Sequence, residues 1–219
     1  MKYAQVQFAP WDKAYSFSLG GLDVAAGDCV IVETELGLEL GKVLALADQK
    51  ETTGEERALK PIIRLASYDD IAVLISKIRE LDLLVKLDTN GFFPEKLQRL
   101  IDLHLLDYIA MDIKYPEKEY PKRTEDKNSL DKVIKSIEII MNSGVDYEFR
   151  TTYVKGIHKI KDSESIAKLI RGSKKYYIQN FRPGKTLNPT LSVSNSFNDN
   201  ELNKILLGAR KFVKNSQVR

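Results

Sequence analysis

The feature that most constrains this chain is an alternation of apolar runs and helix-like segments that begins at residue 67. Each apolar run is short enough for one strand, and the segments between the runs repeat apolar residues at helical spacing. Four such runs occur, at residues 83–89, 107–114, 147–154 and 175–181. Strands that alternate with helices form parallel sheets with right-handed crossovers. The pattern therefore predicts a partial (βα) barrel of four parallel βα units over residues 67–219.

Residues 1–66 follow a different rhythm, in which no long helical period appears. Short strand-like runs are separated by turns, and the stretch Glu35-Leu36-Gly37 has the pattern of a hairpin. Residues 61–66 are the last candidate strand, and Ser67 with Asp70 resembles a capping box at the start of the first helix. We therefore expect an α/β protein in which a small β-rich module, a barrel or a curled sheet, precedes the partial barrel.

The composition argues against several classes of function. The 219 residues include 34 basic and 31 acidic side chains, so the net charge of +3 does not by itself indicate a nucleic-acid partner. No apolar run approaches the ~20 residues that span a bilayer, and the start of the chain lacks the apolar core of a signal peptide. These features predict a cytoplasmic protein with no membrane partner. With one cysteine and two histidines, no internal disulfide can form, and we expect no zinc or iron site built from cysteine and histidine.

Polar residues mark the carboxyl ends of the predicted strands, where parallel α/β proteins hold their ligands. These residues are Asp88-Thr89-Asn90, Asp112 with Lys114, Thr152 with Lys155 and His158, and Asn180 with Arg182 and Lys185. Asp88 and Asp112 end neighbouring strands, so their carboxylates are candidates to hold a hard cation or a ligand amine. The alternative is structural, with Asp88 starting an Asx turn and Asp112 pairing with Lys114 or another base.

Two further charged or titratable residues are candidates. Arg150 lies inside an apolar strand, where a charge requires a partner. It could clamp a ligand carboxylate, but we favour an ion pair with Asp88, Asp112 or Glu148. His158 lies in a loop at a strand end and is a candidate ligand contact, with a solvated loop position as the alternative.

Three stretches carry a resemblance: LLVKLDTNGFFPEKLQRLIDLHLLDYIAMDIKYP, DYEFRTTYVKGIH and YYIQNFRPGKTLNP. Over residues 69–190 the chain resembles the second half of radical S-adenosylmethionine (SAM) activating enzymes, of the type that activates anaerobic ribonucleoside-triphosphate reductase. The resemblance implies that the Asp-Thr-Asn-Gly and Asp-x-Lys strand ends line a SAM site, with a monovalent cation beside the cofactor. The implied site residues are Asp88, Thr89, Asn90, Asp112, Lys114 and His158, with Asp88 and Asp112 as the cation ligands.

The resemblance is incomplete in the parts that carry the family's chemistry. Family members hold an iron–sulfur cluster in a C-x-x-x-C-x-x-C loop and grip the cofactor amine with Gly-Gly-Glu. Neither motif occurs in these residues, and both belong to the βα units that precede the matched half. Lys155 stands where the family usually has proline, and Asn180 where it often has glutamine. We therefore expect no bound cofactor or cluster, no catalytic residues and only weak SAM binding.

The first module resembles a second family. The stretch GD-x-VIVET-x-x-GLELGKV, within residues 3–75, is similar to the start of the polymerase-suppressor-type (PSP) domain of bacterial proteins linked to RNA turnover and sporulation. The chain thus looks like two incomplete families joined near residues 70–82, through a natural gene fusion or a deliberate chimera. The expected function is that of a non-catalytic recombinant with a binding or scaffolding role and a small-molecule or cation ligand.

Two alternatives differ in kind from that expectation. In one, the chain is an activating-type component for anaerobic ribonucleotide reductase, a glycyl-radical enzyme, and the cluster is supplied elsewhere. In the other, the β module is an RNA or protein adaptor, with Lys2, Lys13, Lys42, Trp11 and Tyr15 as a weak nucleic-acid face. We also expect a homodimer, because an apolar sheet face would lie uncovered and two sets of four βα units make the eight of a closed barrel.

Overall fold

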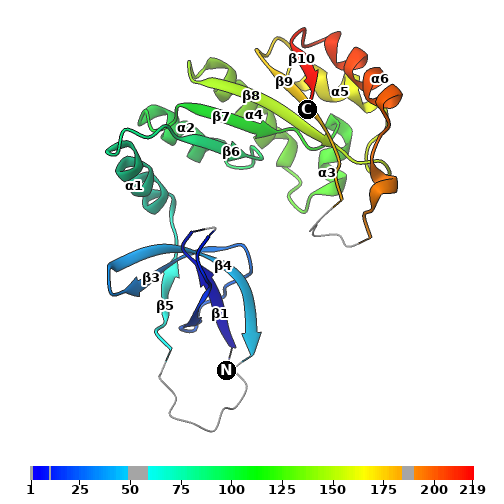
Figure 1. Ribbon diagram of the computed structural model, residues 1–219. Coiled ribbons are helices and arrows are strands. Elements are labelled where there is room, and N and C mark those ends of the chain that lie inside the picture. The colour runs from blue at the N-terminus through cyan, green and yellow to red at the C-terminus, as the bar shows by residue number, and fades with distance from the viewer. Residues whose placement is uncertain (1, 10, 49–58, 184–189) are drawn as a thin grey trace. The chain divides into compact units, whose positions relative to one another are not determined.

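The computed structural model describes residues 2–9, 11–48, 59–183 and 190–219. The chain divides into two compact units, residues 1–74 and 75–219, which are treated separately (Figure 1). The division falls within helix α1 (Tyr68–Arg79), so the domain limits predicted at residues 66 and 67 stay a prediction. The fold class is the predicted one: an antiparallel β module precedes a parallel sheet with alternating helices.

The first unit is a five-stranded antiparallel sheet in the order β2-β1-β4-β3-β5. Its strands are β1 (Lys2–Gln7), β2 (Tyr15–Ser18), β3 (Cys29–Thr34), β4 (Gly37–Asp48) and β5 (Ile62–Leu65). The sheet curls so that β2 meets the segment before β5: the amide of Ser18 donates to the carbonyl of Lys60, next to Pro61, at 3.0 Å. Alternate side chains enclose a small core of Ala4, Val6, Phe17, Val24, Val30, Val32, Val43 and Ile62. The predicted curled β module is thereby confirmed.

The start of α1 follows the predicted capping pattern. A carboxylate oxygen of Asp70 accepts hydrogen bonds from the Ser67 amide at 2.7 Å and from the Ser67 hydroxyl at 2.8 Å. The guanidinium of Arg64 binds both oxygens of the same carboxylate, at 2.6 and 2.7 Å. These donors hold the pKa of Asp70 well below its usual value. The end of β5 and the beginning of α1 are therefore joined through one side chain.

The second unit is built on a parallel sheet in the order β10-β9-β8-β7-β6. The predicted strands appear as β6 (Lys86–Thr89), β7 (Tyr108–Asp112), β8 (Asp146–Tyr153) and β9 (Tyr176–Asn180). A fifth strand, β10 (Ser216–Val218), pairs in parallel with β9 and was not predicted. It was missed because it has three residues, of which only Val218 is apolar, so no alternation marks it.

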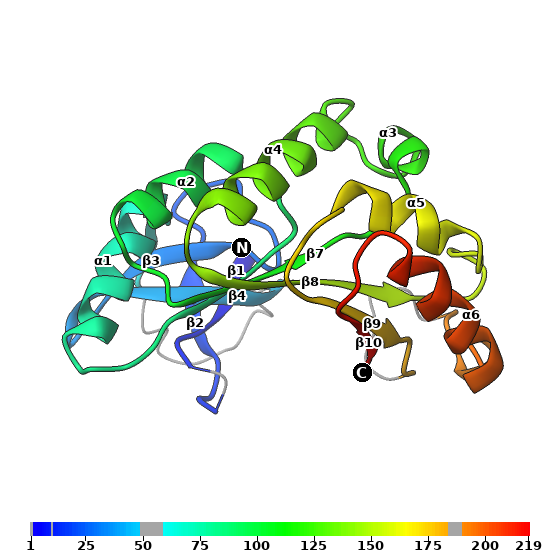
Figure 2. The same cartoon turned by 90° about the horizontal axis from the view of Figure 1, so that it is seen from above.

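Helices cover one face of this sheet. Figure 2 shows α2 (Pro94–Asp102), α4 (Ser129–Asn142), α5 (Asp162–Leu169) and α6 (Asp199–Arg210) along the same side of the strands. The connections also contain the short helices η1 (Glu117–Glu119), α3 (Tyr120–Arg123) and η2 (Val193–Asn195). The side chains that face the helices form the core and include the fully buried Ile109, Met111, Phe149, Tyr153, Tyr176 and Ile178. None of the helices in the described ranges is long and apolar enough to cross a bilayer.

The opposite face of the sheet is polar, so the expectation of an uncovered apolar face was wrong. Strand register places the following residues on that face: Lys86, Asp88, Tyr108, Ala110, Asp112, Glu148, Arg150, Thr152, Tyr177 and Gln179. Side chains alternate between the two faces of a strand, and the bulky apolar residues of β7, Ile109 and Met111, point to the helices. Leu83 and Leu84, which made the first run look apolar, lie before β6 begins.

Gly91 lies in the turn from β6 into α2, where the backbone conformation and the packing both disfavour a side chain. Its φ is +76°, and a Cβ there would lie 2.1 Å from the Cε atom of the fully buried Met111. Gly144 is a matched control. Its φ is +75°, but a Cβ there would have no heavy atom within 4 Å, so Gly144→Ala measures the cost of the backbone conformation alone. We expect Gly144→Ala to lower the free energy of unfolding by roughly 1–2 kcal/mol. Gly91→Ala should cost about 1–3 kcal/mol more, because it overpacks the core. Urea denaturation of both variants measures the difference, and equal costs would contradict the packing argument.

Candidate functional site

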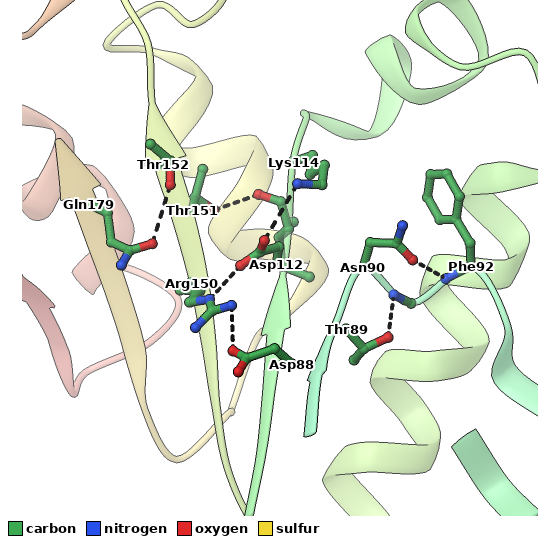
Figure 3. Close-up of polar contacts among 12 residues, drawn as sticks. Asp88, Thr89, Asn90, Phe92, Asp112, Lys114, Arg150, Thr151, Thr152 and Gln179 are labelled. Atoms are coloured by element: carbon green, nitrogen blue, oxygen red, sulfur yellow. Dashed lines mark hydrogen bonds and ion pairs between the residues drawn. The ribbon is translucent and has the colours of Figure 1, made fainter. Parts of the chain in front are cut away.

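Thr89 and Asn90 form the turn that ends β6. The hydroxyl of Thr89 accepts the Gly91 amide at 3.1 Å, and the side-chain oxygen of Asn90 accepts the Phe92 amide at 3.0 Å. The proposed Asx turn at this strand end therefore exists, but Asn90 makes it in place of Asp88. The carboxylate of Asp88 projects onto the open face of the sheet, as Figure 3 shows.

Arg150 joins the two aspartates that end β6 and β7. Its Nη2 lies 2.6 Å from Oδ1 of Asp88, and its Nε lies 2.5 Å from Oδ1 of Asp112 (Figure 3). Lys114 reaches the other oxygen of Asp112 at 3.4 Å, and Lys86 lies 3.8 Å from Asp88. Burial opposes the charge of Arg150, but the hydrogen bonds and charges of Asp112 and Asp88 outweigh it and raise its pKa. The favoured ion pair of Arg150 is confirmed, and so is the pairing of Asp112 with Lys114.

The same geometry bears on the cation site implied at Asp88 and Asp112. One oxygen of each carboxylate is directed at the Arg150 guanidinium, so a cation between them would meet a positive charge. Among the described residues, no group of three or more His, Cys, Asp or Glu side chains is arranged to hold a metal ion. The monovalent-cation site stays a prediction.

His158 is buried, so the alternative of a solvated loop position was wrong. Only 6% of the residue is exposed, and the ring lies beside Tyr153 and Tyr115. The Val154 amide donates to Nδ1 at 3.1 Å, which requires that nitrogen to be unprotonated. Nε2 then carries the proton and donates to the carbonyl of Lys114 at 2.8 Å. Burial lowers the pKa of His158, and the neutral ring ties the loop after β8 to the end of β7.

Two pockets lie at the carboxyl ends of the parallel strands. One, of about 180 Å³, is lined by Asp112, Lys114, Thr152 and His158, together with Ile113, Tyr115, Val154 and Ile157. The other, of about 310 Å³, is lined by Thr152, Gln179, Asn180, Arg182 and Arg219. The two guanidinium groups suit the second pocket to an anion. Lys185, which the sequence places with Asn180 and Arg182 after the same strand, lies outside the described residues.

Two predicted strand-end residues have structural partners. The ammonium group of Lys155 binds Glu201 in α6 at 2.8 Å. The side-chain nitrogen of Asn180 donates to the carbonyl of Phe197 at 2.8 Å, and its side-chain oxygen accepts the Phe197 amide at 2.9 Å. Lys155 therefore connects the loop after β8 to α6, and Asn180 connects β9 to the segment that leads into α6.

Sequence reasoning named Glu148 as a possible partner of Arg150 and missed the polar group that Glu148 forms with other residues of the open face. Glu148 is 3% exposed and accepts hydrogen bonds from the Tyr108 hydroxyl at 3.0 Å and from Arg219 at 3.1 Å. The Arg219 guanidinium lies 3.8 Å from the centre of the Tyr177 ring. Burial, with the hydrogen bond to Glu148, raises the pKa of Tyr108 to about 12. The i, i+2 spacing of Glu148 and Arg150 could have placed both on one face, but no local pattern points to Arg219.

Comparison with known proteins gives a family for this site. The radical SAM superfamily matches residues 56–170, which is more than half of the 219 residues. The chain belongs to the radical SAM superfamily. It is also 34% identical over 139 residues to a protein of Methanocaldococcus jannaschii named as a glycyl-radical enzyme activating enzyme. That match covers 62% of this chain and 58% of the relative, so the chain spans a little over half of the relative's length.

The likeness to solved structures is weak. The chitinase domain of the spore coat protein CotE from Clostridium difficile is 14% identical with a TM-score of 0.38, over 71% of this chain and 55% of that one. A complex of AgrE with L-arginine is 14% identical with a TM-score of 0.24, over 81% of this chain and 33% of that one. Neither bears on the radical SAM assignment.

Radical SAM enzymes use two groups, an iron–sulfur cluster and SAM. The residues of this chain fit these two groups to different degrees. A cluster held by three thiolates does not fit, because the chain has one cysteine, Cys29, an exposed residue of β3 in the first unit. The C-x-x-x-C-x-x-C motif is therefore absent from these 219 residues. The residues that the resemblance assigns to a SAM site fit in part: Asp88 and Asp112 face the same open surface, but both are bound to Arg150, and Thr89 is engaged in its turn.

Replacing Arg150 should destabilise the second unit. Arg150→Gln leaves Asp88 and Asp112 without their shared counter-ion, and we expect the free energy of unfolding at pH 7 to fall by about 1–3 kcal/mol. Lys135→Gln is the control: its ion pair with Glu95 joins side chains that are 56% and 70% exposed, and it should cost less than about 0.5 kcal/mol. Adding Asp112→Asn to Arg150→Gln should recover part of the loss. A cost for Arg150→Gln as small as that of the control would contradict the bridging role.

The buried imidazole should make stability depend on pH. The pKa of His158 is lowered from 6.5, so below pH 6.5 the unfolded chain takes up a proton that the folded protein resists. Stability therefore decreases as pH falls from 6.5 to the folded pKa, by up to about 1.4 kcal/mol per pH unit. Unfolding free energies of the native protein and His158→Asn between pH 5 and 8 measure this. The variant should lose that part of the slope, and parallel profiles would show that His158 is not held neutral.

Proposed function

We propose that this chain is a non-catalytic member of the radical SAM superfamily that binds or scaffolds through the open polar face of its parallel sheet. The observation that carries the proposal is the single cysteine, which lies in β3 of the first unit and leaves the candidate site without cluster ligands. Radical SAM chemistry needs three thiolates at the cofactor. A site that keeps its strand-end carboxylates but lacks those thiolates supports binding without the reaction.

The charge pattern favours a zwitterionic ligand over a simple cation. A bare cation at Asp88 and Asp112 would have to break the bonds of Arg150 and offer nothing in return. A ligand that carries an amine and a carboxylate exchanges partners, because its amine replaces the guanidinium and its carboxylate receives it. SAM is such a molecule. The exchange still gives up two short ion pairs, which is why we expect weak binding.

Calorimetry tests the strength of SAM binding. We expect a dissociation constant above about 100 μM, which corresponds to a binding free energy of less than about 5.5 kcal/mol. Asp112→Asn is the control, and it should remove any signal that arises at this site. A micromolar constant that Asp112→Asn abolishes would contradict the proposal, since about 8 kcal/mol would then come from the half-site.

The second candidate is an activating-type component for anaerobic ribonucleotide reductase, with the cluster supplied by another chain. Its support is the 34% identity to a relative that carries the name of a glycyl-radical enzyme activating enzyme. Anaerobic reconstitution with iron and sulfide, followed by metal analysis and visible absorption, separates the two candidates. We expect less than one iron per chain. Several irons per chain together with cleavage of SAM would replace the non-catalytic proposal with this one.

A homodimer is part of the proposal. Its support is β6, which forms the edge of the parallel sheet in the part of the chain that the structure describes, since an unpaired edge can accept a further strand. Light scattering coupled to gel filtration should give about twice the chain mass of 24.9 kDa. A mass near that of one chain at every concentration would rule the dimer out.

A further inference from the structure

The first unit contains an apolar groove that the radical SAM assignment leaves unexplained. The groove has a volume of about 680 Å³ and lies against β2 and the β3–β4 hairpin. Phe8, Tyr15 and Phe17 line it, with ring centres 5.7 Å apart for Phe8 and Tyr15 and 6.3 Å apart for Phe8 and Phe17. Leu36 also lines it and is 87% exposed. Among the described residues of the first unit nothing covers this apolar surface, and open surface of this kind indicates a place where another molecule binds.

The rim of the groove is acidic. Asp12, Glu33, Glu35 and Glu39 line it, against one lysine, Lys60. Within the described part of the chain, none of these four carboxylates forms an ion pair. Glu39 accepts a hydrogen bond from the Thr34 hydroxyl, which leaves its charge in place. Lys13 is the other nearby cation, and its ammonium group lies over the Tyr15 ring at 5.2 Å. The local charge is therefore negative, although the whole chain carries +3.

The groove also borders a strand edge. Tyr15, Ser16 and Phe17 belong to β2, which ends the order of the sheet. One end of this edge is occupied, because the Ser18 amide donates to the carbonyl of Lys60 at 3.0 Å and Ser18 forms a bridge with Pro61. An added segment would therefore pair next to Tyr15 and Ser16. An extended segment can add to such an edge through main-chain hydrogen bonds and place alternate side chains in the adjoining groove.

We propose that this groove docks an extended peptide segment of a partner protein in which lysine or arginine alternates with aliphatic or aromatic residues. The apolar side chains would lie on Phe8, Tyr15 and Phe17, and the cations would meet Glu33, Glu35 and Asp12. A cation can also be bound by the face of an aromatic ring, as Lys13 already is by Tyr15. Nucleic acid fits poorly, because its phosphates would face the four carboxylates. This inference is independent of the function proposed for the second unit.

Fluorescence anisotropy with short labelled peptides tests the proposal on the full chain. The probe is an octapeptide that alternates lysine and leucine, and its counterpart alternates glutamate and leucine. We expect saturable binding of the lysine peptide, weakened by added salt, and no binding of the glutamate peptide. Glu33→Gln with Glu35→Gln should weaken the lysine peptide at least tenfold. Tyr15→Ala should weaken it several-fold at high salt, where charge contributes least.

The control variant changes the same charge elsewhere. Glu125→Gln with Glu138→Gln removes two exposed carboxylates from the second unit and should leave the affinity unchanged. Equal weakening by both double variants would mean general charge attraction and would overturn the proposal. Binding of single-stranded oligouridylate in place of the peptide would overturn it in favour of RNA. Self-association that Glu33→Gln with Glu35→Gln abolishes, without peptide binding, would assign the groove to a second copy of this chain.

Discussion

The open face of the parallel sheet depends on the ion pairs of the Arg150 guanidinium. This group lies between carboxylates at the ends of two other strands, so the ends of β6, β7 and β8 are joined by one side chain. Helices protect the other face by burying it, but a face left to water has to be stabilised by its own charges. Like charges on adjacent strands destabilise a sheet unless a counter-ion separates them. The same three residues therefore support the sheet and form the candidate site.

That double role gives both carboxylates a structural function of their own. Without Arg150, Asp88 and Asp112 would place two unpaired carboxylates at neighbouring strand ends, at a cost in free energy. Because each is bound to Arg150, both contribute to the stability of the sheet. His158 follows the same logic, since its ring joins the loops after β7 and β8 without any ligand. Strand-end residues that resemble those of a cofactor site are therefore weak evidence that a cofactor binds.

The sequence predicted the parts of this fold that depend on local periodicity. The four predicted parallel strands, the capping of α1 by Asp70 and the curled β module all follow from spacing and turn residues. The features that the sequence did not predict depend on contacts between distant segments. β10 is a strand because it pairs with β9, and Arg219 binds Glu148, which lies 71 positions earlier in the chain. The apolar open face was a different error. The runs were judged by their overall hydrophobicity, although the alternation within β7 already sends Ile109 and Met111 to the helices.

The net charge of the whole chain is likewise a poor guide to the local charge of the first unit. A net charge of +3 describes a sum, and the sequence alone offered scattered lysines of the first module as a weak nucleic-acid face. In the folded unit, Tyr15 from that predicted face lines a groove whose rim has four carboxylates. Two of these, Glu33 and Glu35, lie within three residues of sequence, where a β-hairpin brings them to the same end of the sheet. Recognition responds to the potential within about one Debye length, roughly 8–10 Å, so this local arrangement decides which partners the first unit attracts.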